Sequence, residues 1–555
     1  MRTRIVAVLA ALMLVLAGCA GLPTAGSVNP GLALGEAPDV PDFSFLPNRP
    51  QPGATPEQIV EGFVAAATSP AGNWEIAQLF LAPDFSAEWR PETGVTIDRP
   101  GSRTITVVDA DTVQMTVSQT GDVDETGAFH ASEAGTSTLD YELEQQQDGE
   151  WRISAAPDGV VLNEQDFRVV FDAYGVMFFD PRWQFLVPDM RWFPTRQNVA
   201  TRITQAIIGG TPSPWLSRAV VSAVVEGVDL RDSVPIVQGI AQVELGAAAL
   251  EADPVTLGRL LRQLQASLQG TGVAGVELLV DGTELAVQPA QTLSTAVDAR
   301  PLVQTAEDFG FLGEDALTTL PGLSRRISEI DADSIAVGRG GRVAAVLLAA
   351  GGVVRVEANE PTIADDRRGL IDPAIDPDDG IWTVPESQPA ALTVSNAESE
   401  PAPIANAWPG ATEIAAMQVS RDGTRIAAIV TEGGRDWVSV AGVERNADGV
   451  PVALGTPERL LHPDGVGVDI AWLDDRTLGI IWEGTDGMIV TEQVVGGVST
   501  SGDGPTGSAV SLAAGPTASS ARLLTAEGAL YVRRGTTWQR AAEDVLVLAS
   551  QLGAN

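Results

Sequence analysis

The chain has 555 residues, of which 73 are acidic and 34 are basic, so its formal net charge is −39. A phosphate backbone would repel a surface of this sign, which argues against nucleic-acid binding. With one cysteine and two distant histidines, His130 and His462, the composition also argues against disulfides, a zinc site and a histidine-based triad. Hydrophobic residues make up 44% of the chain, and its length predicts roughly three or four domains.

The N-terminus has the pattern of a bacterial lipoprotein signal. Two arginines precede an apolar run at 5–16, which is too short for a bilayer core that needs roughly 20 apolar residues and has the flanks of a cleaved signal. Two small residues, the second of which is Gly18, then precede Cys19. This lipobox predicts cleavage between Gly18 and Cys19. A plain signal peptide with a chance cysteine is the alternative interpretation.

We expect Cys19 to carry an S-linked diacylglycerol and an N-acyl chain, because lipoprotein processing uses a cysteine thiol as its acceptor. Each buried acyl methylene contributes about 0.8 kcal/mol, and stable anchoring takes more than one chain. The mature protein is therefore expected on the extracytoplasmic face of the cell membrane, held by its lipid. The next segment, up to about residue 53, is rich in proline and glycine, which predicts a tether.

The first folded module is predicted to begin with a capped helix. Thr55 suits the N-cap, Pro56 suits the first turn, and Gln58 completes a capping box. A second short helix is expected near 74–81. From residue 104 the apolar period changes to two, which predicts strands; they fall at 105–108, 113–117, 137–143 and 150–153. Helices followed by a curved meander resemble the nuclear-transport-factor-2-like (NTF2-like) cone.

One acidic stretch of this module matches part of a calcium-loop template. Asp122, Asp124, Thr126, Gly127 and Glu133 fall at positions 1, 3, 5, 6 and 12 of the EF-hand pattern. An EF-hand loop lies between helices, whereas the flanks here alternate like strands. An acidic hairpin tip, with Asp-Glu-Thr-Gly forming the turn, is therefore the preferred interpretation. Calcium binding by Asp122, Asp124 and Glu133 remains a weak alternative.

The next segment opens with an aromatic-rich stretch at 164–186. Thr195 is then predicted to cap a helix that ends at Gly209-Gly210. Strands are expected at 219–225 and 241–245.

The clearest predicted helix starts at Asp253-Pro254 and ends at Gly270. A hairpin over 276–287 follows, with its turn at Asp281-Gly282. We expect the helix to pack against its own sheet, although its leucine stripe would also suit a dimer seam. The stripe consists of Leu257, Leu260, Leu261, Leu264 and Leu268.

From about residue 301 short β runs separated by glycine and aspartate turns replace the helical periods. A strand–turn–strand pattern recurs, at 337–346, 419–429, 471–481 and, degraded, 511–524. Spacings of this kind are typical of propeller blades, and we expect five or six blades. A β-sandwich is the alternative. The aspartate-rich insert at 364–380 is predicted to be a solvated loop.

These residues carry a resemblance to known families. The order "ITQAIIGGTPSPWLSRAVVSAVVEGVDL", the capped leucine helix and "VELLVDGTELAV" resembles a GerMN domain. The lipobox and "FFDPRWQFLVPDMRWFP" before it resemble the actinobacterial LpqB lipoprotein family, whose members end in a β-propeller. The expected fold class is therefore multidomain α+β and all-β: an NTF2-like α+β domain, a GerMN-type α/β domain and a C-terminal β-propeller. The expected boundaries are 1–18 for the signal peptide, 19–53 for the lipidated tether, 54–160 for the first domain, 161–295 for the second and 296–555 for the propeller.

The chain lacks the sequence motifs of common enzymes: it has no glycine-rich phosphate loop, G-x-S-x-G, S-x-x-K or H-E-x-x-H. We therefore expect no catalysis, no metal and no cofactor besides the lipid on Cys19. The resemblance to the LpqB family implies that the partners are the lipid bilayer and the extracytoplasmic domain of a sensor histidine kinase of the MtrB type. The expected function is accessory regulation of that kinase in envelope and cell-division signalling.

Two other functions remain open. One is binding of an envelope glycan or peptide, for which sugar-stacking tryptophans would have to surround a propeller funnel. The other, less favoured, is glycan hydrolysis, which needs two facing carboxylates in that funnel. The candidate stacking residues are Trp382, Trp408, Trp437, Trp472, Trp482 and Trp538.

Overall fold

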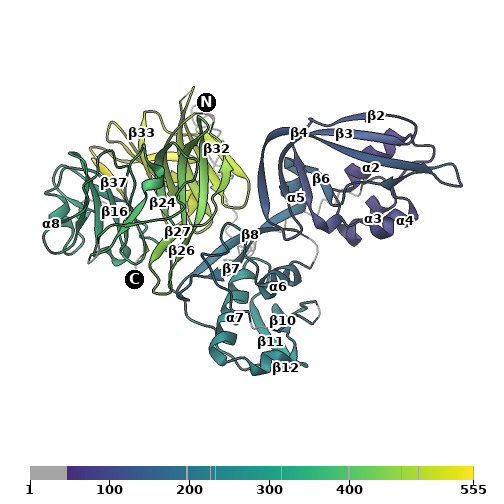
Figure 1. Ribbon diagram of the computed structural model, residues 1–555, viewed down its shortest axis with the longest axis horizontal. Coiled ribbons are helices and arrows are strands. Elements are labelled where there is room, and N and C mark those ends of the chain that lie inside the picture. Colours follow the sequence, from purple (N-terminus) through teal and green to yellow (C-terminus); the bar gives the residue numbers. More distant parts are fainter. Residues whose placement is uncertain are drawn as a thin grey trace, which may run out of the picture. The chain divides into compact units, whose positions relative to one another are not determined.

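In the computed structural model, helices precede and then alternate with strands as far as residue 284, and strands predominate from residue 302 to residue 551. The described residues are 47–553 apart from 196–197, 225–226, 232, 314–315, 398–399, 464 and 486, and apart from the side chains of 133 and 134. The lipobox with Gly18 and Cys19, and the tether up to residue 46, lie outside the described residues. Figure 1 shows three successive modules along the rest of the chain.

The first module is an α+β domain in which short helices cover one curved sheet. Its helices are α2 (Pro56–Ala66), α3 (Ala71–Gln78), α4 (Pro83–Glu88) and the 3₁₀ turn η1 (Pro91–Thr93). Its strands are β1 (Val95–Asp98), β2 (Thr104–Val107), β3 (Thr112–Val123), β4 (Phe129–Gln145), β5 (Trp151–Ala155) and β6 (Val160–Asn163). The sheet order is β5-β4-β3-β1-β6, and β2 pairs with β3.

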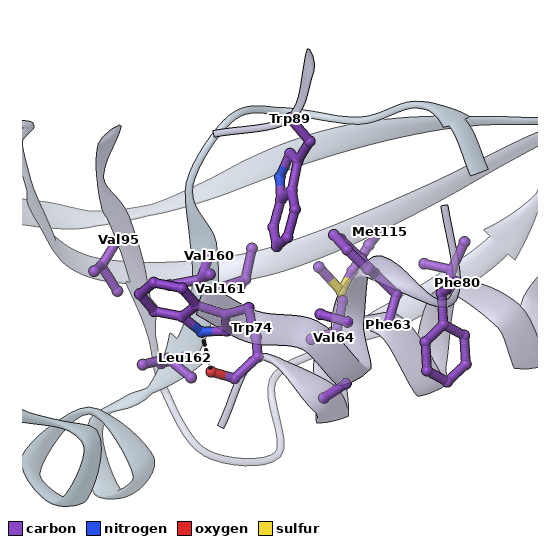
Figure 2. Close-up of a cluster of buried hydrophobic side chains, with 14 of the residues drawn as sticks. Phe63, Val64, Trp74, Phe80, Trp89, Val95, Met115, Val160, Val161 and Leu162 are labelled. Carbon is purple, nitrogen blue, oxygen red and sulfur yellow. Dashed lines mark hydrogen bonds between the residues drawn. The ribbon is translucent and has the colours of Figure 1, made fainter. Parts of the chain in front are cut away.

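The expected capping box is present at the start of α2. The Thr55 hydroxyl accepts from the Gln58 amide, and the Gln58 side chain accepts from the Thr55 amide. The apolar face of α2 then packs into the core of the module, which is drawn in Figure 2. Trp74 is fully buried there, and its indole N–H donates to the Ala67 carbonyl over 3.0 Å. Local capping signals and apolar spacing therefore predicted this helix correctly.

The second module contains a strand–helix–strand unit and a long aromatic hairpin. Its helices are α5 (Glu164–Val170), α6 (Val199–Gly209), α7 (Pro254–Ser267) and the 3₁₀ turn η2 (Ala247–Glu251). Its strands are β7 (Phe171–Phe179), β8 (Leu186–Pro194), β9 (Ile236–Val237), β10 (Ile240–Glu244), β11 (Gly275–Val280) and β12 (Thr283–Glu284). Strands β10 and β11 are parallel, with α7 as their crossover.

Helix α7 and the hairpin after it match the expectation. Asp253 caps α7 by accepting from the Val255 and Thr256 amides. All five leucines of the stripe are buried, and four of them belong to the core cluster of this module, which argues for packing within the chain and against a dimer seam. The hairpin turns at Asp281 and Gly282, both with positive φ, as a tight two-residue turn requires.

Two expectations for this module were wrong. Helix α6 starts at Val199 with Asn198 at its N-cap, so Thr195 does not cap it; the Thr195 amide donates to the carbonyl of Val170 at the end of α5. The predicted strand at 219–225 forms only a single bridge, between Val221 and Phe179. The amide of Ala223 donates instead to the buried Gln263 side chain of α7. A side chain therefore satisfies a backbone group that a neighbouring strand would otherwise pair.

The third module is a β-propeller. The first three sheets consist of β13 (Leu302–Gln304), β14 (Phe309–Leu312), β15 (Leu317–Thr318) with β37 (Val547–Gln551); β16 (Ala332–Val337), β17 (Ala344–Leu348), β18 (Val353–Val356), β19 (Thr362–Asp365); and β20 (Ala374–Ile375), β21 (Ile381–Thr383), β22 (Thr393–Ser395), β23 (Ala402–Pro403). Short helical turns interrupt them at α8 (Ser324–Ile327), η3 (Arg339–Gly341) and η4 (Pro389–Ala391).

The remaining three sheets complete the ring. They consist of β24 (Glu413–Val419), β25 (Arg425–Glu432), β26 (Arg435–Arg445), β27 (Pro451–Leu454), β28 (Glu458–Leu461); β29 (Val466–Trp472), β30 (Thr477–Gly484), β31 (Gly487–Val494), β32 (Ser499–Asp503); and β33 (Ala509–Ala513), β34 (Arg522–Thr525), β35 (Leu530–Arg534), β36 (Thr537–Ala542), with the turn η5 (Ala518–Ser520). The described residues thus form six blades, the upper value expected from sequence.

The arrangement of the inner strands distinguishes this domain from a sandwich. The innermost strand of each blade contacts the innermost strand of the next, in the closed order β37-β16-β20-β24-β29-β33 and back to β37. The C-terminal strand β37 pairs with β13 and so completes the blade that the first strands of the module begin. The strand–turn–strand repeats seen in the sequence are the two innermost strands of four blades.

The insert at 364–380 is only in part the solvated loop that we expected: Asp366, Asp372 and Asp378 are exposed, but two other aspartates are not. Asp365 and Asp376 are buried. Asp365 forms an ion pair with Arg367 and accepts from the Thr383 hydroxyl, and Asp376 accepts from the indole N–H of Trp382. These carboxylates fix the start of the third blade. Acidic composition alone suggested solvent exposure because the sequence does not show these long-range partners.

Candidate functional site

The propeller channel is lined by the inner strands, which begin at one common end. Strands β16 and β37 run parallel to each other, so their first residues lie at the same end of the ring. Strands β16, β24, β29 and β33 each carry a register irregularity near this start. A bulge leaves one residue unpaired and turns it out of the ladder. The residues skipped in pairing are Asp333, Ala415, Val468 and Val510.

Two carboxyl groups of this channel, those of Asp372 and Asp469, are close enough for their negative charges to repel each other. Asp372 precedes β20 and Asp469 lies on β29. Asp372 is exposed as a residue, yet desolvation by the protein around its carboxyl group raises its pKa to about 6, against a hydrogen bond from Ser334. Burial, and then repulsion from Asp372, raises the pKa of Asp469 to about 8, although the amides of Ile470 and Leu512 each donate to it over 2.7 Å. The pair therefore resists carrying two negative charges at neutral pH.

A peptide segment closes the other end of the channel. We call residues 293–300, which join the second module to the first propeller strand, the strap. Arg421 donates to the Thr295 carbonyl over 3.5 Å, and Arg522 donates to the Asp298 carbonyl over 2.8 Å. The Thr295 hydroxyl donates to Asp475 over 2.8 Å. Because these partners come from three different blades, the strap crosses the ring rather than following its edge.

The strap is also packed and anchored at its two ends. Val297, near its centre, is only 7% exposed. At its start the Leu293 amide donates to the Gln184 carbonyl of the second module, and Arg339 donates to the Ser294 carbonyl. At its end the Gln551 side chain donates to the Asp298 carbonyl. The channel is thus covered at this end by a segment that belongs to the fold.

The opposite end of the channel carries exposed apolar side chains. Val466 begins β29, Val510 lies at the start of β33, and Leu546 directly precedes β37. Their exposed fractions are 68%, 46% and 60%. We call these three residues, which come from consecutive inner strands, the apolar arc. Together with the exposed Asp333 and Asp372 they form what we call the open mouth of the channel.

The contacts that join the modules lie away from the open mouth. The indole N–H of Trp192 donates to the Gly496 carbonyl over 2.9 Å, in the hairpin between β31 and β32. Arg182 forms an ion pair with Asp378, in the turn between β20 and β21. Both turns follow strands that run away from the open mouth, so they lie at the strap end of the ring. The second module therefore docks on the closed end of the propeller.

A cavity of about 340 Å³ lies at the strap end, between the first two blades. Leu302, Phe311 and Gln551 contribute to its wall. Its one arginine, Arg300, lies 4.8 Å from the centre of the Phe311 ring and is ion-paired with Asp298 over 2.9 Å. The charged groups of this cavity are therefore paired with each other.

The candidate stacking tryptophans do not surround the channel opening. Trp382, Trp408, Trp437, Trp472 and Trp482 are all buried, and only Trp538 is partly exposed, on the outer strand β36. Trp472, for example, packs under Arg425, with 4.6 Å from the guanidinium to the ring centre. The tryptophans thus serve packing between strands and blades, which removes the feature that favoured glycan binding.

The acidic stretch of the first module forms the tip of a hairpin. It lies between β3 and β4, and the Asp124 carboxylate accepts from the Thr126 amide and hydroxyl and from the Ala128 amide. Asp122 is paired within the sheet, opposite His130, and the side chain of Glu133 is not among those described. Within the described residues no group of three or more acidic, histidine or cysteine side chains is placed to hold a metal ion.

His130 connects this hairpin to the propeller. Its Nε2 lies 3.4 Å from Asp124, and its Nδ1 lies 3.8 Å from Glu458 of β28. Hydrogen bonds to Asp124 and then Glu458 raise the pKa of His130 to about 10. The imidazole is therefore cationic at neutral pH and acts as an ion-pair partner of two modules.

Sequence reasoning missed the two features that define the channel. Asp372 was grouped with a solvated insert, and Asp469 was not singled out because one aspartate in a strand carries no motif. The strap was read as the boundary between two domains.

The sequence matches three family models in order along the chain. They are the N-terminal domain of lipoprotein LpqB at residues 49–168, a sporulation and spore germination domain (Germane) at 176–286, and the lipoprotein LpqB β-propeller domain at 301–547. The fold and these family matches define the class of the protein. It is a lipoprotein whose described residues form two modules of mixed helices and strands followed by a six-bladed propeller. The chain belongs to the LpqB lipoprotein family.

Relatives support this assignment over most of the chain. Lipoprotein LpqB of Mycolicibacterium smegmatis is 27% identical over 520 residues, which cover 86% of this chain and 85% of the relative. Lipoprotein LpqB of Mycobacterium tuberculosis is 28% identical over 520 residues, covering 86% and 84%. In the part of the chain that the structure describes, no helix has the length and hydropathy to cross a membrane.

Among solved structures, a chain of a nidogen/laminin complex is similar to 46% of this chain and to 97% of its own length, with a TM-score of 0.35 and 10% identity. A likeness at this level carries no argument about function. The propeller assignment rests on the strand pairing above and on the matched family model.

Proposed function

We propose that this protein is a non-catalytic lipoprotein, anchored on the extracytoplasmic face of the cell membrane, that acts as an accessory regulator of a sensor histidine kinase. The observation that carries the proposal is the asymmetry of the propeller. One end of its channel holds the strap and the second module, while the other presents exposed apolar and acidic residues. A free face of this kind is what a protein partner requires.

The expected lipid anchor on Cys19 is the second argument for the proposed regulation of a kinase. Lipid on Cys19 would confine the protein to the membrane surface from which the sensor domain of a kinase protrudes, which raises the effective concentration of the two partners. A flexible tether of about thirty residues has a root-mean-square end-to-end distance of roughly 30 Å. The propeller would then sample the region just above the membrane.

Catalysis receives less support from the site. Asp372 and Asp469 are the pair that a glycan hydrolase would use in the channel, because their raised pKa values suit a general acid. However, both oxygens of Asp469 accept backbone amides, and the channel mouth has no tryptophan among its described residues on which a sugar would stack. We therefore interpret Asp372 and Asp469 as residues that shape a binding face and give it negative charge, and not as catalytic groups.

The proposal is tested with the lipidated mature chain in nanodiscs and the purified extracytoplasmic domain of the sensor kinase. We expect saturable binding and a change in kinase autophosphorylation when both are in the same membrane. In cells, Cys19→Ser should reduce crosslinking to the kinase, with the protein level as control. Absence of binding, together with unchanged kinase output after deletion of the gene, would refute the proposal.

A further inference from the structure

The open mouth of the propeller channel combines two kinds of surface. On one side the apolar arc exposes Val466, Val510 and Leu546 from three consecutive inner strands. On the other side Asp333 and Asp372 are exposed at the starts of the neighbouring blades. Val466, Val510 and Leu546 lie at or just before the starts of strands that are neighbours in the ring, so they share one end of the propeller, and exposed apolar side chains that gather on one surface mark binding sites more often than scattered ones do.

We infer that the open mouth is a docking surface for a basic, amphipathic segment of a protein partner. This inference rests on the proposed function and specifies which face of the propeller the partner takes and by what chemistry. The apolar side chains of the segment would cover the apolar arc, and a lysine or arginine would reach the carboxyl groups of Asp372 and Asp469. Long basic side chains suit this geometry, because their aliphatic stems cover apolar surface while their charged heads stay polar.

Charge complementarity selects a basic segment over an acidic or neutral one. Asp333 and Asp372 stand at the mouth, Asp469 lies deeper, and Glu413 is exposed at the start of β24. Exposed arginines near this end lie outside the inner strands, in α8, in the β19–β20 connection, in the β25–β26 hairpin and in β28, where the arginine is ion-paired with Glu432; they include Arg325, Arg368, Arg435 and Arg459. The centre of the mouth is therefore acidic, and a cation placed there would relieve the repulsion between two carboxyl groups.

The closed end strengthens the assignment. Arg421, Arg522 and Asp475 hold the strap across the ring, and the side chain of Val297 in the strap is buried. The strap and the second module therefore occupy the end of the ring opposite the open mouth, which leaves the open mouth as the end that a partner segment can approach.

The test compares two double variants that add the same charge. V466D/V510D places two carboxylates on the apolar arc, and V107D/I363D places two on exposed valine and isoleucine positions of β2 and of the outer strand β19. Added negative charge would strengthen non-specific attraction of a basic ligand, so any loss of affinity in V466D/V510D reports lost apolar contact. Urea unfolding verifies that both variants keep the stability of the unaltered chain.

Affinity is measured for three probes against the lipidated mature chain in nanodiscs. The probes are the extracytoplasmic domain of the sensor kinase, a synthetic helical peptide of lysine and leucine, and the same peptide with glutamate for lysine. We expect V466D/V510D to weaken binding of the kinase domain and of the lysine peptide at least about tenfold, since two apolar contacts are lost. V107D/I363D should stay within about twofold, and the glutamate peptide should not bind.

The outcomes separate the two proposals. If the kinase domain binds the unaltered chain and V466D/V510D equally well, the docking surface is refuted and the proposed function stands. If the kinase domain does not bind but the lysine peptide depends on the apolar arc, the docking surface stands and the kinase proposal is refuted. Equal weakening by V107D/I363D, or binding of both peptides alike, also refutes the docking surface.

Discussion

At the strap end of the propeller channel, buried arginines and carboxylates from several blades hold one peptide segment, whereas at the open mouth the inner strands begin with exposed valine, leucine and aspartate. The first end is polar and closed, and the second is apolar, acidic and open. Buried polar groups need partners, so the closed end is expected to tolerate little change. Exposed apolar groups contribute little to stability, so the open mouth is free to serve binding.

The largest effect on stability is expected at the closed end. Arg425 and Asp422 form a buried ion pair, with both side chains at most 1% exposed, and the pair supports the turn between β24 and β25. Asp422→Ala leaves a buried guanidinium without its carboxylate, which we expect to cost about 3–5 kcal/mol of unfolding free energy. Urea unfolding followed by tryptophan fluorescence measures this. A cost below about 1 kcal/mol would show that water compensates the charge and that the closed end is less rigid than we argue.

Asp469→Asn tests the electrostatics of the channel itself. The pKa of Asp469 is about 8 in the folded chain and about 4 when unfolded, so the folded state binds more protons between these values. Stability of the unaltered chain therefore falls as the pH rises from about 4 to 8, and the asparagine variant lacks this loss. We expect the variant to be more stable above pH 8 and nearly equal below about pH 4, measured by thermal unfolding across that range. A constant difference at all pH values would place Asp469 outside the titrating pair.

Thr295→Val removes one hydrogen bond from the strap without changing its shape. The Thr295 hydroxyl donates to Asp475, whose second oxygen has no hydrogen-bond partner among the described residues. We expect a loss of about 1–2 kcal/mol, because a buried carboxylate loses its donor. Hydrogen exchange should be faster in residues 293–300 and unchanged in β29. Uniformly faster exchange would mean that the strap is part of the global fold and not a separate closure.

The smallest effect is expected at the open mouth. Val466 is 68% exposed, so Val466→Ser should change the unfolding free energy by less than about 0.5 kcal/mol. The matched change in the same strand, Ile470→Ser, affects a side chain that is 1% exposed and should cost several times more. If the two variants lose comparable stability, Val466 packs against the propeller and does not belong to a free binding face.

Local signals accounted for the parts of the fold that the sequence predicted. The Thr55–Gln58 capping box, the Asp253 cap and the Asp281-Gly282 turn each depend on residues that are close in sequence, and all three are present. The propeller was predicted from repeated strand–turn–strand patterns, because a blade is itself a local unit. The β-sandwich alternative failed on the closed ring of inner strands, which only long-range pairing reveals.

The features that sequence reasoning missed depend on partners far along the chain. Ala223 looked like part of a strand, but its amide pairs with the side chain of Gln263. Asp372 and Asp469 lie in different blades, and only closure of the ring brings their charges together. The strap looked like a linker because its contacts are made by its backbone carbonyls, which every residue possesses. Composition and periodicity carry no information about such contacts.

The most direct test of the account is the affinity of the lipidated mature chain for the extracytoplasmic domain of the sensor kinase, measured for the unaltered chain, V466D/V510D and V107D/I363D. The account predicts binding by the unaltered chain, at least about tenfold weaker binding by V466D/V510D, and little change for V107D/I363D. Equal affinity of all three forms would contradict the claim that the open mouth is the face the partner takes.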